Sequence, residues 1–463
     1  MKDFRQTILL AALLLILGGV LWWLVFTQEE ALEEKTVYRL AEEKINSIEV
    51  TYTPHAAEEE APDHFLLRRG ADQKWTMTEP VNDEVDTGAV ERILEVMTKL
   101  VAESRYEEVT DYAQYGLDQP VLRVKVGLTT GESRELLIGD ETPVAYRFYA
   151  RFAGEPEVFV INGTDRGGLN HRAKEVRLKK VLPVDVNDLT RLDLRTDKGK
   201  AYTLAKEERG WRLTAPFAEL LSHHMVVDFL VKLNELRAED FIDEAPDLAV
   251  YGLDKPRFTL DLTTADGEKV TLQVTGTADA SYLTHNRRAC LLKLGEDESL
   301  DFLDLKLADY INKNLNSLDK QKAHSVILRE RGGRELTVEE EDLGDVWWGY
   351  LGSFFFTEPY YEQGQDTPAP RSAFADHDPL WEVVIKVKEE EKRKQKRDRA
   401  GGDTDATADV QLKIYPFTTE EEYLITSSQR AYVYKIGRET VDDLIERIKK
   451  TVEGQEKEAG SEE

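Results

Sequence analysis

Two short segments that contain histidine have residue types that could bind a metal ion or move a proton. Residues 376–378 place one histidine between two aspartates, a pattern that could orient a general base. They stand directly before Pro379, and because Asp and Pro form turns, we interpret this tripeptide as a turn. His223 and His224 follow Ser222 at the expected start of a helix, where neighbouring side chains point about 100° apart and cannot easily share a metal ion. We therefore expect neither group to be an active site.

The other polar motifs also lack the spacing that chemistry requires. Residues 402–409 are rich in Asp and Thr but lack the terminal Glu and central Gly of a calcium loop. Cys290 is the single cysteine, and its apolar neighbours predict a buried strand and not a nucleophile. The basic cluster at 392–397 follows three glutamates without aromatic residues nearby, which indicates a solvated loop. Without a phosphate-binding glycine loop, a His-Glu-x-x-His or a Gly-x-Ser-x-Gly motif, we expect no catalytic residue, cofactor or metal.

Length and charge limit the class of protein. The chain has 463 residues, and a prior of about 100–200 residues per domain predicts roughly three domains. The apolar fraction of 41% is enough to form globular cores. The formal charge of −29 argues against nucleic-acid binding, because that affinity comes from clustered Lys and Arg side chains that release counterions.

A duplicated turn organises the chain. The hexapeptide Tyr-Gly-Leu-Asp-x-Pro occurs at 115–120 and again at 251–256, a displacement of 136 residues (251 − 115). The same displacement relates further residues across 75–131 and 211–267, which chance matching does not explain. The repeated pattern consists of Trp75, Pro80, Tyr115, Gly116, Leu117, Asp118 and Pro120 in the first copy and Trp211, Pro216, Tyr251, Gly252, Leu253, Asp254 and Pro256 in the second.

We interpret this turn as a structural requirement, because duplication copies what every unit needs, whereas catalytic sites are usually single. Gly116 and Gly252 can take a positive φ, and the prolines lack an N–H, so the hexapeptide is typical of a turn that begins an edge strand. Its Tyr and Leu side chains would fill the core beneath it. A ligand contact is the alternative, since Tyr offers a stacking face and Asp an acceptor.

Each repeat combines strands with one helix. The strand that carries the tryptophan ends at the proline, and a helix then begins after Asp86 or Ser222, both of them residue types that cap helices. Apolar residues recur on one face of this helix, and alternating strands follow the turn. We therefore predict an α+β fold, an N-terminal transmembrane helix followed by tandem repeats of antiparallel sheet plus capped helix.

The N-terminal segment predicts attachment to a membrane. Residues 8–26 are uncharged and would form a helix roughly 28 Å long, close to the hydrocarbon thickness of a bilayer. Lys2 and Arg5 precede this run and glutamates follow it, so the positive-inside rule places residues 1–7 in the cytoplasm and the bulk in the periplasm or outside the cell. A cleaved signal peptide is the alternative, but glutamates stand where small residues should precede the cleavage site. We expect a single-pass protein of the cell inner membrane.

The predicted domains follow from these elements. A stalk at 27–44 leads to a first repeat at 45–184 and a second at 185–320. A degenerate third repeat at 321–452 carries a charged loop at 388–408 but no copy of the turn. The acidic tail at 453–463 is expected to be disordered.

Four segments carry a family resemblance: Lys-Trp-Thr-Met-Thr-Glu-Pro at 74–80, the turn at 115–120, Leu-Ile-Gly-Asp at 137–140 and Glu-Val-Phe-Val at 157–160. With the N-terminal anchor, they resemble a bacterial family called domain of unknown function 4340. The second repeat departs from it at 273–276, so a function tied to 137–140 is expected in the first repeat only. Genes of this family often lie near those of gliding-motility-type ABC transporters, so the resemblance implies an accessory role without established catalytic residues.

Three functions remain open from the sequence. The leading hypothesis is a non-enzymatic, membrane-anchored accessory or scaffold subunit of a bacterial envelope complex, with protein partners in an ABC-type transporter and no nucleic acid. An envelope hydrolase of glycan or peptide would need two carboxylates about 5 to 10 Å apart in a deep pocket. A lipid or solute carrier would need a continuous apolar groove.

Overall fold

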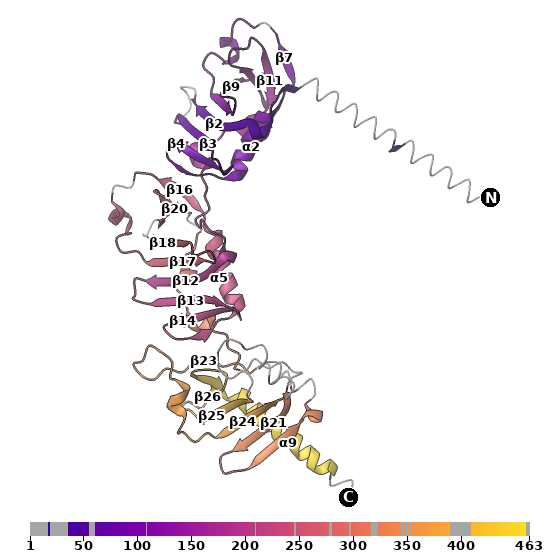
Figure 1. Ribbon diagram of the computed structural model, residues 1–463, viewed down its shortest axis with the longest axis vertical. Coiled ribbons are helices and arrows are strands. Elements are labelled where there is room, and N and C mark those ends of the chain that lie inside the picture. The colour runs from indigo at the N-terminus through magenta and orange to yellow at the C-terminus, as the bar shows by residue number, and fades with distance from the viewer. Residues whose placement is uncertain are drawn as a thin grey trace, which may run out of the picture. The chain divides into compact units, whose positions relative to one another are not determined.

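The computed structural model describes residues 17–18, 36–54, 61–107, 109–208, 210–244, 247–276, 280–295, 298–315, 323–343, 347, 351, 354–388 and 409–459 (Figure 1). The chain forms two compact units. The first contains residues 1–181, 237–245 and 290–293. The second contains residues 182–236, 246–289 and 294–463.

Antiparallel sheets make up most of the fold, so the predicted α+β class is wrong. Short strands such as β6 (Lys99–Val101) and β7 (Ser104–Tyr106) add to the sheets, and three residues carry too little alternation to be predicted as strands. In the part of the chain that the structure describes, no helix is long and apolar enough to cross a bilayer. The predicted span at 8–26 lies outside the described residues except for Leu17 and Gly18.

The first unit is built on one sheet with the strand order β5-β4-β3-β2-β8-β9-β10-β11-β7. Its central strand β2 (Ile45–Tyr52) pairs with β3 on one side and β8 on the other, and residues such as Ile48 and Val50 alternate into the core. A separate pair joins β1 (Thr36–Arg39) to β6. The remaining strands are β3 (Asp63–Arg69), β4 (Trp75–Glu79), β5 (Asp83–Glu84), β8 (Leu122–Leu128), β9 (Ser133–Glu141), β10 (Arg147–Phe152) and β11 (Val158–Asn162).

Helix α2 (Thr87–Thr98) covers the core of this sheet. The Asp86 carboxylate accepts a hydrogen bond of 2.9 Å from the Ala89 N–H, which confirms the predicted cap. Val90, Ile93, Leu94 and Met97 recur every three or four residues and join the buried side chains of β2 and β3 in one cluster. The unit also contains α3 (Gly163–Leu169), α4 (Ala173–Val176), β16 (Ala238–Ile242) and most of β20 (Leu291–Leu294).

The second unit contains a sheet with the same connectivity. Its strands run in the order β15-β14-β13-β12-β17-β18-β19, matching β5-β4-β3-β2-β8-β9-β10. Helix α5 (His223–Glu235) begins after Ser222 as predicted, but the Ser222 side chain makes no capping hydrogen bond. The bounds are β12 (Leu189–Thr196), β13 (Ala201–Glu207), β14 (Gly210–Ala215), β15 (Glu219–Leu220), β17 (Phe258–Thr264), β18 (Lys269–Gly276) and β19 (Ser281–His285), and the short helix α6 is Leu307–Tyr310.

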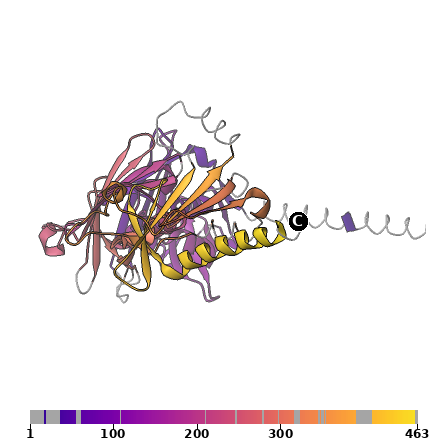
Figure 2. The same ribbon diagram turned by 90° about the horizontal axis from the view of Figure 1, so that it is seen from below.

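A further sheet of the second unit follows the same plan, with the order β22-β21-β24-β25-β26-β27-β23. The first long strand of each of the three sheets has a bulge at the same place, after Ile45, Leu189 and Ala323. Helix α9 (Arg438–Ala459) contacts β22 and β27 and lies along this sheet in Figure 2. The strands are β21 (Ala323–Glu330), β22 (Glu335–Glu339), β23 (Glu358–Pro359), β24 (Trp381–Val387), β25 (Val410–Pro416), β26 (Glu422–Ser427) and β27 (Val433–Gly437). The domain boundaries stay predictions.

Candidate functional site

The duplicated turn has the same backbone shape in both copies. Gly116 has φ of 67° and Gly252 has φ of 76°, each at the end of a short 3₁₀ helix, as predicted for these glycines. Leu117 and Leu253 are buried, whereas Tyr115 and Tyr251 are half-buried and both aspartates, Asp118 and Asp254, are exposed. The Leu side chain therefore fills the core, and the Tyr side chain does so only in part.

The strands after the turns are not edge strands, which corrects the prediction. β8 pairs with β2 and β9, and β17 pairs with β12 and β18, so both lie inside their sheets. The prolines, Pro120 and Pro256, precede the strands, so the missing N–H groups fall outside the ladders.

The segment 137–140 packs against the first turn. A Cβ atom added to Gly139 would lie 2.2 Å from the backbone oxygen of Tyr115, and one added to Gly116 would lie 2.4 Å from a carboxylate oxygen of Asp140. In the second copy, Thr275 approaches Gly252, and the corresponding distance to its hydroxyl is 3.0 Å. The first copy thus differs from the second in the close approach of two backbone segments, which explains why glycine stands at positions 116 and 139.

The tryptophan and proline landmarks lie at equivalent places. Trp75 begins β4 and is half-buried beneath the guanidinium of Arg69, 5.8 Å from the ring centroid. Trp211 lies in β14 and is buried. Pro80 and Pro216 each follow a cis peptide bond, and each stands between the tryptophan strand and a two-residue strand.

The two-residue strands β5 and β15 carry carboxylates at equivalent positions, Asp83 and Glu219, again 136 residues apart (219 − 83). In the first unit, Asp83 is bound by Arg177, whose Nε lies 2.6 Å from it. The other two guanidinium nitrogens of Arg177 donate to both oxygens of Asp243, each at 2.8 Å, and the ring of Phe241 lies 4.0 Å away. Because the Arg177 and Asp83 side chains are only 5% exposed, this is a buried ion pair.

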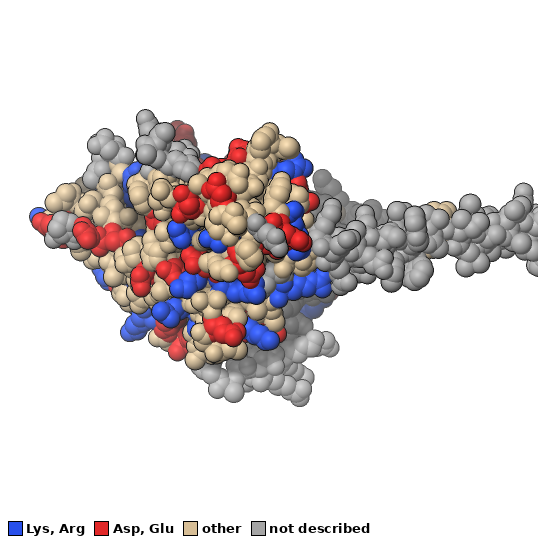
Figure 3. All heavy atoms as spheres, turned by 90° about the horizontal axis from the view of Figure 1, so that it is seen from above, with Lys and Arg blue, Asp and Glu red and all other residues tan. Residues whose placement is uncertain are grey.

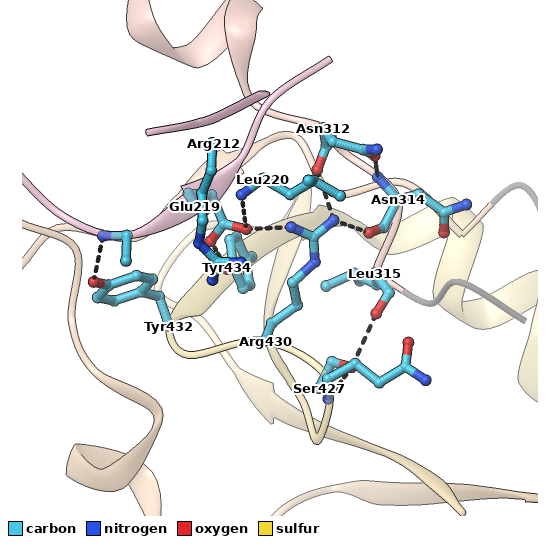
Figure 4. A network of polar contacts seen from close by, with 12 residues as sticks. Arg212, Glu219, Leu220, Asn312, Asn314, Leu315, Ser427, Arg430, Tyr432 and Tyr434 are labelled. Carbon is cyan, nitrogen blue, oxygen red and sulfur yellow. Dashed lines mark hydrogen bonds and ion pairs between the residues drawn. The ribbon is translucent and has the colours of Figure 1, made fainter. Parts of the chain in front are cut away.

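In the second unit, Glu219 is bound by two residues from the sheet of β21 to β27 (Figure 4). Arg430, in the turn between β26 and β27, donates to one carboxylate oxygen, and the hydroxyl of Tyr434 on β27 donates to the other at 2.5 Å. The side chains of Glu219 and Arg430 are 4% and 8% exposed. Burial and the adjacent carboxylate raise the pKa of the Tyr434 hydroxyl above its ordinary value, so Tyr434 stays protonated and remains a donor.

Backbone groups complete this network. The Arg430 guanidinium also donates to the carbonyl oxygens of Asn312, at 2.8 Å, and Asn314. The hydroxyl of Ser427 donates to the carbonyl of Leu315 at 2.9 Å, and the Tyr432 hydroxyl accepts from the N–H of Ala218 at 3.2 Å. The charged groups are therefore satisfied by hydrogen bonds, which offsets the cost of burying them. We call the three-residue groups Asp83–Arg177–Asp243 and Glu219–Arg430–Tyr434 the two clamps.

The histidine and cysteine candidates do not come together. His223, His224 and the tripeptide 376–378 are exposed, and His377 stacks on Phe374 with ring centroids 4.7 Å apart. Cys290 is buried, as predicted. Among the described residues, no group of three or more His, Cys, Asp or Glu side chains is arranged to hold a metal ion. The motifs at 392–397 and 402–408 lie outside the described residues.

Sequence analysis missed the clamps, although two signals point to them. The displacement that relates the duplicated turns also relates Asp83 to Glu219. A second pattern consists of Arg, then Ala directly after it, then Lys five residues after the Arg. It occurs at 288–293 and at 430–435, a displacement of 142 residues (430 − 288). This pattern marks Arg430 but not Arg177, which has no repeated neighbours.

A family model described as Domain of unknown function (DUF4340) matches residues 75–256 and again residues 228–348. Together the two matches extend over both copies of the duplicated turn and into the sheet of β21 to β27. Neither the curated proteins nor the solved structures contain a significant match to this chain.

Proposed function

We propose, since this chain belongs to the family Domain of unknown function (DUF4340), that it is a non-enzymatic, membrane-anchored scaffold subunit of a bacterial envelope complex, associated with an ABC-type transporter. The observation that carries the proposal is the pair of clamps. Asp83 and Glu219, at equivalent positions in two copies, are both buried and both held by arginine. Carboxylates held in this way are paired with a buried cation and are not available to a substrate.

The alternative is a hydrolase with paired carboxylates. A cavity of the first unit, of about 650 Å³, is lined by four carboxylates, Asp63, Glu175, Asp240 and Asp243. Each of these carboxylates has a structural partner. Asp63 accepts from the backbone N–H of Ala173 at 2.8 Å, and Glu175 accepts from that of Arg172 at 2.8 Å. Asp240 accepts from the backbone N–H of Phe241 at 3.0 Å, and Asp243 holds Arg177. Acid–base catalysis needs a carboxyl group that can exchange protons with a substrate, so this arrangement favours the scaffold.

The location in the inner membrane is supported by the sequence alone. The uncharged run at 8–26, with Lys2 and Arg5 before it, is the basis for placing the bulk of the chain in the periplasm or outside the cell. The transporter association is supported by the gene neighbourhood that the family resemblance implies. A lipid carrier needs a continuous apolar groove, and two cavities, one in each unit, are instead lined mainly by polar and charged side chains.

Crosslinking in intact cells, followed by mass spectrometry of the full-length chain, tests the proposal. We expect crosslinks from exposed lysines of both units to envelope proteins that include a transporter subunit. The matched control is the same chain with Lys198 and Lys200 changed to Arg, which keeps the charge of that turn but removes its amines. Recovery of the chain from membranes without an envelope partner would contradict the scaffold role.

A further inference from the structure

The sheet of β21 to β27 has an open polar cavity with a volume of about 860 Å³. This volume falls within the roughly 300–1,000 Å³ that ligand sites commonly have. β25 forms its floor. Val410, Leu412 and Ile414 of this strand are fully buried, and the residues between them, Gln411 and Lys413, line the cavity. The 3₁₀ helix Arg371–Phe374 forms one wall.

The cavity lies where the other sheets carry the duplicated turn. In the first unit, Leu137 of β9 packs with Leu117 of the turn in a small apolar cluster. Lys413 has the same position in its sheet as Leu137 has in the sheet of the first unit. Leu137 of β9 lies opposite Arg123 of β8, and Lys413 of β25 lies opposite Glu382 of β24, the strand that corresponds to β8. The sequence has no copy of the Tyr-Gly-Leu turn after residue 256, and a lysine stands where the first sheet has Leu137.

Cationic side chains outnumber carboxylates around the cavity. The charged lining residues are Arg212, Arg371, Lys413, Arg430 and Asp409. Arg430 is held by Glu219, Arg212 has Glu207 at 3.9 Å, and Asp409 is held by Lys386 at 2.7 Å. Within the described part of the chain, no carboxylate lies within 4.0 Å of the charged nitrogens of Arg371 or Lys413. There the guanidinium of Arg371 donates only to the carbonyl of Ser427, at 3.0 Å. Two cations are thus left for a ligand, in a chain with 90 acidic residues.

Neutral groups complete the lining. Ser372, Gln411, Ser428 and Gln429 offer hydroxyl and amide groups, and Phe374 adds an aromatic face. Such a mixture suits a small organic molecule whose polar groups need donors and acceptors and whose carbon skeleton needs an apolar contact. Carboxylate and phosphate groups share the chemistry that a guanidinium and an ammonium group recognise, namely two or more anionic oxygens.

We propose that this cavity binds a small organic anion, whose carboxylate or phosphate group is held by Arg371 and Lys413. The ligand site is independent of the scaffold role, because it depends on neither clamp partner being free. It adds a soluble ligand to the protein partners of the complex.

Isothermal titration calorimetry of the full chain at low ionic strength tests the site, with citrate, glycerol 3-phosphate and uncharged glycerol as probes. We expect citrate or glycerol 3-phosphate to bind with a dissociation constant below about 1 mM, and glycerol not to bind. Binding of citrate alone assigns a carboxylate ligand, and binding of glycerol 3-phosphate alone assigns a phosphate ligand. Lys413→Gln and Arg371→Gln should each weaken binding about tenfold or more, whereas Lys413→Arg should keep it within about threefold.

The control variant is Arg334→Gln, which removes the same charge from the exposed turn between β21 and β22 and should leave binding unchanged. The proposal is overturned if neither anion binds below about 10 mM, or if Arg334→Gln weakens binding as much as Lys413→Gln does. The second result would show attraction to general surface charge. Circular dichroism of each variant verifies that it is folded.

Discussion

At the scale of single residues, glycine positions report how closely the backbone segments of the first unit approach each other. Gly139 lies against the backbone of Tyr115, which is part of the duplicated turn and is the last residue of the 3₁₀ helix Ala113–Tyr115. Gly167, in helix α3, has no atom within 4 Å of an added Cβ. The two positions therefore separate steric crowding from the general effect of adding a methyl group.

We predict that Gly139→Ala lowers the free energy of unfolding of the first unit by about 1–3 kcal/mol, the usual cost of overpacking. Gly167→Ala should be neutral or stabilising by up to about 1 kcal/mol, because alanine favours a helix over glycine. Urea unfolding followed by circular dichroism measures both. Equal effects of the two substitutions would contradict the close packing.

The Tyr434 hydroxyl makes the second unit sensitive to alkaline pH. Its pKa is raised in the folded chain by burial and by Glu219, so the folded state keeps the proton that the unfolded state loses near pH 10. The contribution to stability is present in full below pH 10 and is lost as pH rises further, at up to about 1.4 kcal/mol per pH unit.

Tyr434→Phe removes this proton while it leaves the ring in place. We expect the variant to be less stable than the wild type at pH 8, because Glu219 loses a donor, and the difference to shrink between pH 10 and pH 11. Thermal unfolding at several pH values gives this difference directly and cancels the contributions of other tyrosines. A difference that is constant with pH would show that the hydroxyl does not keep its proton.

At the scale of elements, the two capped helices differ in one bond. Asp86 caps α2 through its carboxylate, whereas Ser222 stands at the same place before α5 without a capping hydrogen bond. Asp86→Ala should therefore cost about 1 kcal/mol of unfolding free energy, and Ser222→Ala should cost clearly less. Denaturant unfolding of the two variants measures both costs. Equal losses would mean that Ser222 also caps its helix.

Elements set by local rules were the ones that the sequence could predict. The positive φ of Gly116 and Gly252, the cap at Asp86 and the apolar stripe of α2 each depend on residues a few positions apart. The interior position of β8 and the dominance of sheets could not be predicted in this way, because strand neighbours come from distant segments. The clamps fall in the same class, since 94 residues separate Arg177 from Asp83 and 211 separate Arg430 from Glu219.

At the scale of the whole molecule, charge is distributed unevenly between surface and interior. Figure 3 shows acidic and basic side chains interspersed on the face in view. Exposed cross-strand pairs such as Arg195 and Asp261, 2.6 Å apart, each contribute little because water and salt screen them. The buried pairs of the two clamps differ, because removing one partner leaves an uncompensated charge away from water.

The central claim is that the edge carboxylates fasten strands within each unit and do not serve chemistry. A double-mutant cycle in the full chain tests it most directly, with Glu219→Gln, Arg430→Met and the double variant, and with Glu335→Gln and Arg329→Met as an exposed matched pair. We predict that each single change at the clamp costs about 3–5 kcal/mol and that the double change costs at least about 2 kcal/mol less than their sum, whereas the exposed pair couples by less than about 1 kcal/mol. Additive costs at Glu219 and Arg430, within about 0.5 kcal/mol, would contradict the claim.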